Sequence, residues 1–147
     1  MNPDIKRILI VDDSPEDVVL TSSALAENNL ANEIIIAEDG LEALDYLHKR
    51  GKFANVNGLP AVILLDIKMP GDDGVTILKK IKSVDPTAAV ILMTAYPSDD
   101  TITQALNSGA YDYILKPFNI EKIQFLIERA ISYHKLLKGS GKISKKP

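Results

Sequence analysis

Five short runs rich in apolar residues divide the chain at regular intervals, and each is followed by a polar residue. The clearest is residues 61–65, where Ala-Val-Ile-Leu-Leu leads directly into Asp66. An unbroken apolar run of this length is typical of a strand that is buried on both faces, as in a parallel sheet. The other four runs lie at residues 8–11, 33–37, 88–93 and 111–115.

Segments with helical periodicity separate these runs. Ser14 and Pro15, with the acid Asp17 three residues after the serine, resemble a capping box at the start of the first helix. In the second helix, leucines recur at spacings of three and predict one apolar side: Leu41, Leu44 and Leu47. The last helix is expected from Asn119 onward, and its apolar residues follow a clear 3.6-residue period: Ile123, Leu126, Ile127, Ala130 and Ile131.

Strands that alternate with helices in this way predict an α/β fold, in which helices cover both faces of a parallel sheet. Right-handed crossovers favour a doubly wound sheet with the strand order 2-1-3-4-5. The segment between Gly51 and Pro60 is polar, and it is longer than most connections between a helix and a strand.

Composition is that of one globular domain, because 46% of the 147 residues are hydrophobic and 25% are charged. The absence of cysteine excludes disulfides, thiolate metal sites and a cysteine nucleophile. No apolar run approaches the roughly 20 residues of a membrane span, and the first residues have no signal-peptide pattern. We therefore expect a cytoplasmic protein without membrane contact.

The net charge of −3 is unevenly distributed along the chain. Residues 135–147 hold five lysines and no acid, so the remainder is more acidic than the whole. An acidic body is not typical of nucleic-acid binding, and we expect none. Residues 1–135 are expected to form the domain, and residues 136–147 a flexible basic tail.

Polar side chains stand at the carboxyl ends of four predicted strands: Asp12 and Asp13, Asp66, Thr94, and Lys116. In a parallel sheet these ends lie on one edge, where open α/β sheets place their ligand sites. Clustered carboxylates repel one another unless a cation joins them, and Mg2+ prefers such oxygen ligands. With a lysine ammonium and a hydroxyl added, the set suits a phosphoryl group that is transferred to a carboxylate.

These residues resemble the receiver domain of two-component response regulators, over about residues 5–135. The motifs that carry the resemblance are Asp12-Asp13, Asp66 with Met69-Pro70 and Gly74, Thr94-Ala95, and Lys116-Pro117-Phe118. The resemblance implies a flavodoxin-like (βα)5 fold and a single-domain regulator. It also implies a phosphoacceptor signalling domain, which is not an enzyme beyond its own phosphotransfer and dephosphorylation.

The family's site residues carry over by position. Asp66 would accept the phosphoryl group. Asp13, Asp66 and the backbone carbonyl of Lys68 would bind Mg2+ directly, and Asp12 would act through a bound water.

Lys116 and Thr94 would hold the phosphoryl oxygens, and the peptide bond before Pro117 is expected to be cis. Tyr113 would act with Thr94 as the switch, turning inward when Thr94 moves toward the phosphoryl group. This change would alter the face formed by the fourth helix, the fifth strand and the fifth helix.

The resemblance implies three kinds of partner. A sensor histidine kinase or phosphotransfer protein would donate the phosphoryl group, and a downstream protein would read the switched face. A homodimer through the same face is a further expectation. The long segment 51–60 resembles an extension in stand-alone receivers that are paired with bacterial phytochrome kinases.

Two other functions use the same predicted fold. A phosphatase of the haloacid-dehalogenase type also forms an aspartyl-phosphate, but it has a second acid two residues after the nucleophile, where this chain has Lys68. A flavodoxin-like cofactor binder needs a glycine or hydroxyl cradle for phosphate after the first strand, where this chain has the acids Asp12 and Asp13.

Overall fold

The five apolar runs form one parallel sheet in the computed structural model, which describes residues 6–56, 58–67, 74–95, 99–117 and 119–140. The strand order is β2-β1-β3-β4-β5, which confirms the predicted doubly wound arrangement. Every neighbouring pair of strands runs parallel. The strands are β1 (Arg7–Val11), β2 (Glu33–Ala37), β3 (Val62–Asp66), β4 (Ala89–Thr94) and β5 (Asp112–Leu115).

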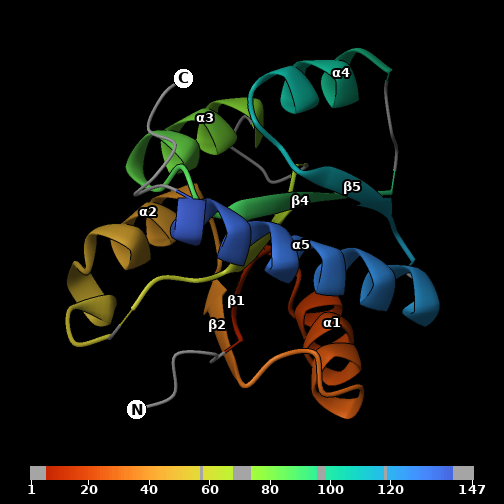
Figure 1. The fold of residues 1–147 in the computed structure, drawn as a ribbon. Helices are drawn as coiled ribbons and strands as arrows, with labels where there is room; N and C mark the ends of the chain where they lie inside the picture. Colours follow the sequence, from red (N-terminus) through yellow and green to blue (C-terminus); the bar gives the residue numbers. More distant parts are fainter. Residues whose placement is uncertain (1–5, 57, 68–73, 96–98, 118, 141–147) are drawn as a thin grey trace.

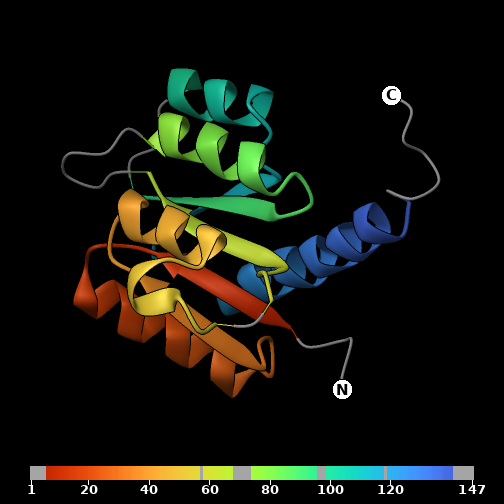
Figure 2. The ribbon, with the colours of Figure 1, turned by 90° about the vertical axis from the view of Figure 1, so that its left-hand side faces the viewer.

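Helices cover both faces of this sheet (Figure 1). Figure 2 shows α2, α3 and α4 side by side on one face, while α1 and α5 pack on the other. The α-helices are α1 (Pro15–Glu27), α2 (Gly40–His48), α3 (Gly74–Val84), α4 (Asp99–Asn107) and α5 (Ile120–Ser140). The layers and the strand order are those of the flavodoxin-like fold.

Two apolar cores, one on each face, hold the central strands. β3 and β4 are buried along their whole length, because helices lie above and below them. Successive side chains of a strand point to opposite faces, so Leu64 packs in one core and Leu65 in the other. This double burial fixes the strands and, with them, the residues at their carboxyl ends.

The apolar stripe of α5 is buried as its period predicts, since none of its five residues is more than 9% exposed. The leucine spacing in α2 was less informative, because Leu41 is 66% exposed. Leu47 is buried as predicted, and Leu44 packs partly buried against the same core, which Ala43 and Tyr46 of α2 also join. An α-helix has 3.6 residues per turn, so residues on one face are separated by alternating spacings of three and four. Residues at repeated spacings of three lie at progressively different angles around the helix.

Helix α5 continues to Ser140, so its last turn lies in the part of the chain that we expected to be a flexible tail. The residues after position 135 include Leu136, Leu137 and Lys138, which are strong helix formers, and they propagate the preceding helix. Residues 141–147 lie outside the described part of the chain. Among the described helices, α5 included, none combines the length and apolar character that crossing a bilayer requires.

The long segment after α2 contains a short 3-10 helix, η1 (Gly51–Phe53), and is anchored by an aromatic contact. Phe53 is buried, and its ring meets Tyr46 edge to face, with 5.4 Å between the ring centroids. The side chain of Lys49 also donates to the carbonyl of Gly58 at 3.1 Å. One buried aromatic residue in a polar segment produces no repeating pattern of apolar positions. The sequence alone therefore indicates only a loop here.

Tyr46 provides a test of this packing. It is fully buried, and its hydroxyl has no hydrogen-bond partner among the described residues. Burial raises the pKa of Tyr46 from 10.0 to about 12. We expect Tyr46→Phe to stabilise the protein by about 1 kcal/mol near neutral pH, because it removes a buried unpaired group. Urea denaturation of both proteins measures this difference.

The same variant has a predicted pH dependence. The tyrosine ionises at a pKa near 10.0 in the unfolded chain and near 12 in the folded protein, so the free energy of unfolding of the wild-type protein falls as the pH rises from 10.0 to about 12. The phenylalanine variant should lack this component of the alkaline loss. A variant that is less stable than the wild-type protein at neutral pH would show that the hydroxyl has a partner.

Candidate functional site

Backbone hydrogen bonds between neighbouring strands fix the site residues at one edge of the sheet. The amide of Asp12 donates to the carbonyl of Ala37 at the end of β2, at 3.0 Å. The amide of Lys116, just beyond β5, donates to the carbonyl of Thr94 at 2.8 Å. Asp66 is the last residue of β3 and lies in register with Met93, the neighbour of Thr94. The predicted convergence of these strand ends is therefore observed.

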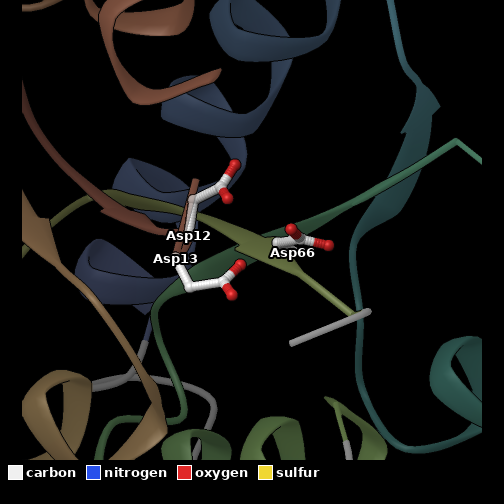
Figure 3. A group of neighbouring side chains, drawn as sticks. All are labelled: Asp12, Asp13 and Asp66. Carbon is white, nitrogen blue, oxygen red and sulfur yellow. The ribbon is translucent and has the colours of Figure 1, made fainter. Parts of the chain in front are cut away.

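Three carboxylates gather at this edge, and Figure 3 shows them at the ends of β1 and β3. Asp12, Asp13 and Asp66 each offer an oxygen within 4.8 Å of the others. Asp12 and Asp66 are buried, whereas Asp13 is exposed. Such a group of oxygens, open to solvent on one side, suits a hard divalent cation.

Lys116 supplies the positive charge of the cluster. Its Nζ atom lies 2.8 Å from Asp17 Oδ2, 2.9 Å from Asp12 Oδ2 and 3.3 Å from Asp66 Oδ2. Burial alone would lower the pKa of Lys116, but the hydrogen bonds to Asp17 and Asp12 and the charge of Asp66 outweigh it and raise this pKa. Lys116 therefore stays charged, and its ammonium group is held over the carboxylates.

The pKa of Asp12 is raised, and burial is the main cause. The hydrogen bond from the Ser14 amide to Oδ1, at 3.0 Å, and the ion pair with Lys116 act in the opposite direction. The nearby charge of Asp66 adds to the rise. A cation bound beside Asp12 would favour its charged form and so oppose the effect of burial.

Asp17 belongs to the cluster, although the sequence predicted only a helix cap for it. Ser14 Oγ does accept a hydrogen bond from the Asp17 amide at 3.3 Å, as in a capping box. The reciprocal bond is replaced, because the Ser14 amide donates to Asp12 and the Asp17 carboxylate binds Lys116. The spacing of the cap motif gave no indication of this ion pair, which joins residues 99 positions apart.

The remaining predicted residues occupy the following positions. Thr94 is buried at the end of β4, and Tyr113 is partly buried in β5 against the core on the face covered by α2, α3 and α4. The peptide bond between Lys116 and Pro117 is cis, in agreement with the expectation from the family. Lys68, Met69, Pro70 and Phe118 lie outside the described residues.

Gly74 allows helix α3 to begin directly against the end of β3. A Cβ atom at this position would lie 2.8 Å from both Cα and Cβ of Ile67, which is too close for any side chain. Ile67 follows Asp66, so the glycine permits the tight packing that fixes the chain just after this carboxylate.

A groove of about 520 Å³ opens beside Lys116, between α1 and the start of α5. Its walls are largely apolar, with Leu20 of α1 68% exposed and Ile120 of α5 42% exposed. Asp17, Thr21 and Lys116 are its polar lining residues. The groove thus continues from the charged cluster onto an exposed apolar surface of α1.

Known proteins are similar to this chain in sequence and in fold. The family model described as the response regulator receiver domain matches residues 8–128. Regulatory protein AtoC of Escherichia coli (strain K12) is 37% identical over 134 residues, which is 91% of this chain and 27% of AtoC.

The DNA-binding transcriptional regulator NtrC of the same strain is 38% identical over 127 residues, which is 86% of this chain and 25% of NtrC. The chain therefore spans about a quarter of the length of these relatives. The solved structure of the bacteriophytochrome response regulator AtBRR is 34% identical, with a TM-score of 0.76, and the match covers 89% of this chain and 95% of that one.

The crowding of the carboxylates leads to a stability prediction. Without metal, Asp66→Asn should fold and be as stable as the wild-type protein, or more stable by up to about 1 kcal/mol, because one of the mutually repelling charges is removed. Urea denaturation in the presence of a chelator measures the difference.

Lys116→Met provides the contrast, since it leaves the carboxylates without their ammonium partner. It should destabilise the protein by on the order of 3 kcal/mol. An Asp66→Asn protein that is unfolded, or as unstable as Lys116→Met, would contradict the interpretation that Asp66 is not needed for folding.

Proposed function

Since the chain belongs to the response regulator receiver domain family, as the match over residues 8–128 shows, we propose that Asp66 is its phosphoacceptor. The observation that carries this assignment is that Asp66 contacts Lys116 and lies beside the carboxylates of Asp12 and Asp13. It lies at the end of a buried strand, with one oxygen 3.3 Å from Lys116 Nζ. The side chain is 9% exposed, which leaves a carboxylate at the surface end of a rigid strand.

The proposed reaction is transfer of a phosphoryl group from a phosphohistidine. A carboxylate oxygen of Asp66 attacks phosphorus, the bond between phosphorus and the imidazole nitrogen breaks, and the electron pair stays on the imidazole. Lys116 is positioned to stabilise the negative charge of the phosphoryl oxygens, and the Thr94 hydroxyl is proposed to donate to one of them. The domain is proposed to promote only this transfer and its own dephosphorylation.

The proposed cofactor is Mg2+, which would neutralise charge on the phosphoryl oxygens when bound. Asp13 and Asp66 are the proposed direct ligands, together with the carbonyl of Lys68, and Asp12 would act through a water molecule. The donor set fits, because all three carboxylates offer oxygens within one small space. Both oxygens of Asp12 already accept hydrogen bonds, from Ser14 and Lys116, which favours its indirect role.

Phosphorylation is proposed to act through Thr94 and Tyr113. Thr94 would move toward the phosphoryl group, Tyr113 would turn inward, and the face formed by α4, β5 and α5 would change. Exposed apolar residues already lie on these elements, including Leu106, Leu115 and Phe125. This face is the proposed binding surface for a downstream protein or for a second copy of the chain.

The phosphodonor is proposed to be a sensor histidine kinase or a phosphotransfer protein that contacts the groove beside Lys116. A protein that brings an imidazole to Asp66 must touch the rim of the site, and the exposed part of α1 is adjacent to it. Leu20 and Val19, which is 62% exposed, offer an apolar contact there.

The remaining proposals concern context. We propose a cytoplasmic protein whose residues 1–147 bind neither DNA nor membranes. NtrC is named a DNA-binding regulator, but this chain matches only 25% of its length. A domain boundary near residue 135 stays a prediction, since the family match ends at residue 128 and α5 at Ser140.

Phosphorylation itself is tested with acetyl phosphate. The wild-type protein should gain the mass of one phosphoryl group when Mg2+ is present, and Asp66→Asn should gain none. Asp13→Asn should react slower by about tenfold or more, because a metal ligand is lost. Intact-protein mass spectrometry follows the reaction. The control is Glu38→Gln, an exposed acid outside the cluster; an Asp66→Asn protein that is still phosphorylated would refute the assignment.

The docking surface is tested by comparing two exposed leucines. Leu20→Ser should slow phosphotransfer from a cognate kinase by about tenfold, as expected for loss of a central apolar contact. It should leave phosphorylation by acetyl phosphate unchanged. Leu41→Ser is the matched control, because Leu41 is 66% exposed but lies on α2, on the opposite face of the sheet. Equal effects of the two variants on the kinase reaction would contradict the proposal.

A further inference from the structure

The ammonium group of Lys116 has as many carboxylate partners as it has hydrogens to donate. Asp17, Asp12 and Asp66 each accept one contact, at 2.8, 2.9 and 3.3 Å. The longest of the three is the one to the proposed phosphoacceptor. A phosphoryl group on Asp66 therefore has to compete for Lys116 with carboxylates that already hold it.

The three partners differ in how easily they can release Lys116. The side chain of Asp12 is 0% exposed, that of Asp66 is 9% exposed, and that of Asp17 is 39% exposed. A buried carboxylate that loses its cation pays a large desolvation cost, whereas a partly exposed one is rehydrated. Asp17 is thus the partner that can leave most readily.

A second hydrogen-bond donor for the Asp17 carboxylate lies one helical turn away. Thr21 is 1% exposed, and its Oγ1 has no hydrogen-bond partner among the described residues. Residues four positions apart on a helix lie on the same face, and both Asp17 and Thr21 line the groove beside Lys116. A buried hydroxyl without a partner is costly, so Thr21 has a donor to offer to a carboxylate that leaves Lys116.

We propose that Asp17 is a positioning residue that changes partner when Asp66 is phosphorylated. In the unphosphorylated protein its carboxylate holds the ammonium group of Lys116. When phosphorylation places a dianionic group on Asp66, the N–H of Lys116 that had donated to Asp17 donates to a phosphoryl oxygen. The Asp17 carboxylate then accepts a hydrogen bond from the Thr21 hydroxyl instead. No proton is transferred, because only hydrogen bonds are exchanged.

This role has a direct consequence for the phosphorylated state. The charge of Asp17 competes with the phosphoryl group for the same cation, so it weakens the hold of the site on that group. A merely structural Asp17 would have the opposite effect, since its loss would leave Lys116 less well placed. The inference rests on the proposed phosphorylation of Asp66, and the test separates the two.

The probe is beryllofluoride with Mg2+, which mimics a phosphoryl group on a carboxylate without turnover. Asp17→Asn should bind it roughly two- to fivefold more tightly than the wild-type protein, the size expected for loss of a partly exposed ion pair. The control is Glu16→Gln, which removes one exposed negative charge from the neighbouring position of α1 and should change the affinity little. Unchanged or weaker binding by Asp17→Asn would overturn the proposal.

Thr21→Val tests the second partner, because valine keeps the shape and removes the hydroxyl. This variant should bind beryllofluoride about twofold more weakly, since the released carboxylate then lacks a donor. In the Asp17→Asn background the same substitution should have no effect, which a double-mutant cycle measures. Equal effects of Thr21→Val in both backgrounds would overturn the exchange between Lys116 and Thr21.

The two levels of failure are distinguishable. If the wild-type protein neither binds beryllofluoride nor gains mass with acetyl phosphate, the proposed function fails and this inference with it. If the wild-type protein does both and Asp17→Asn behaves as Glu16→Gln does, only the role of Asp17 is refuted. Urea denaturation of each variant shows whether a change in affinity comes from a loss of folding.

Discussion

One ammonium group shared among several carboxylates is the interaction on which the site depends. Lys116 lies 2.8 to 3.3 Å from three acidic side chains, and two of these are almost completely buried. Without this cation the buried charges would repel one another in a poorly solvated place. With it, the edge of the sheet keeps a carboxylate at the end of β3 that is held in position beside an ammonium group which it shares with two other acids.

The packing of the sheet makes this arrangement rigid. β3 and β4 are covered on both faces, so the ends of these strands cannot shift without disturbing two cores. The strand ends are joined by backbone hydrogen bonds, such as that from Lys116 to Thr94. The residues with chemical roles therefore lie at the ends of the strands, outside the apolar cores, and the packing of those cores still fixes their positions.

The sequence was most informative where a physical pattern is local. Buried strands are recognisable in the sequence as apolar runs. In a parallel sheet the carboxyl ends of these strands lie on one edge, so the sequence alone predicts that Asp12, Asp66 and Lys116 lie close together. The role of Asp17 could not be foreseen, because its partner is 99 residues away and its position also suits a helix cap. The exposure of Leu41 shows the same limit, since repeated spacings of three fit a helix without fixing its buried face.

The contact between Gly74 and Ile67 gives α3 a mechanical connection to the site, although no residue of α3 takes part in the chemistry. A Cβ atom at Gly74 would lie 2.8 Å from the Ile67 backbone, so there is no slack between the helix and the chain that follows Asp66. A displacement of that chain cannot be absorbed locally, because close-packed groups transmit strain. Such a displacement would therefore move α3, which lies on the opposite face of the sheet from α1 and α5.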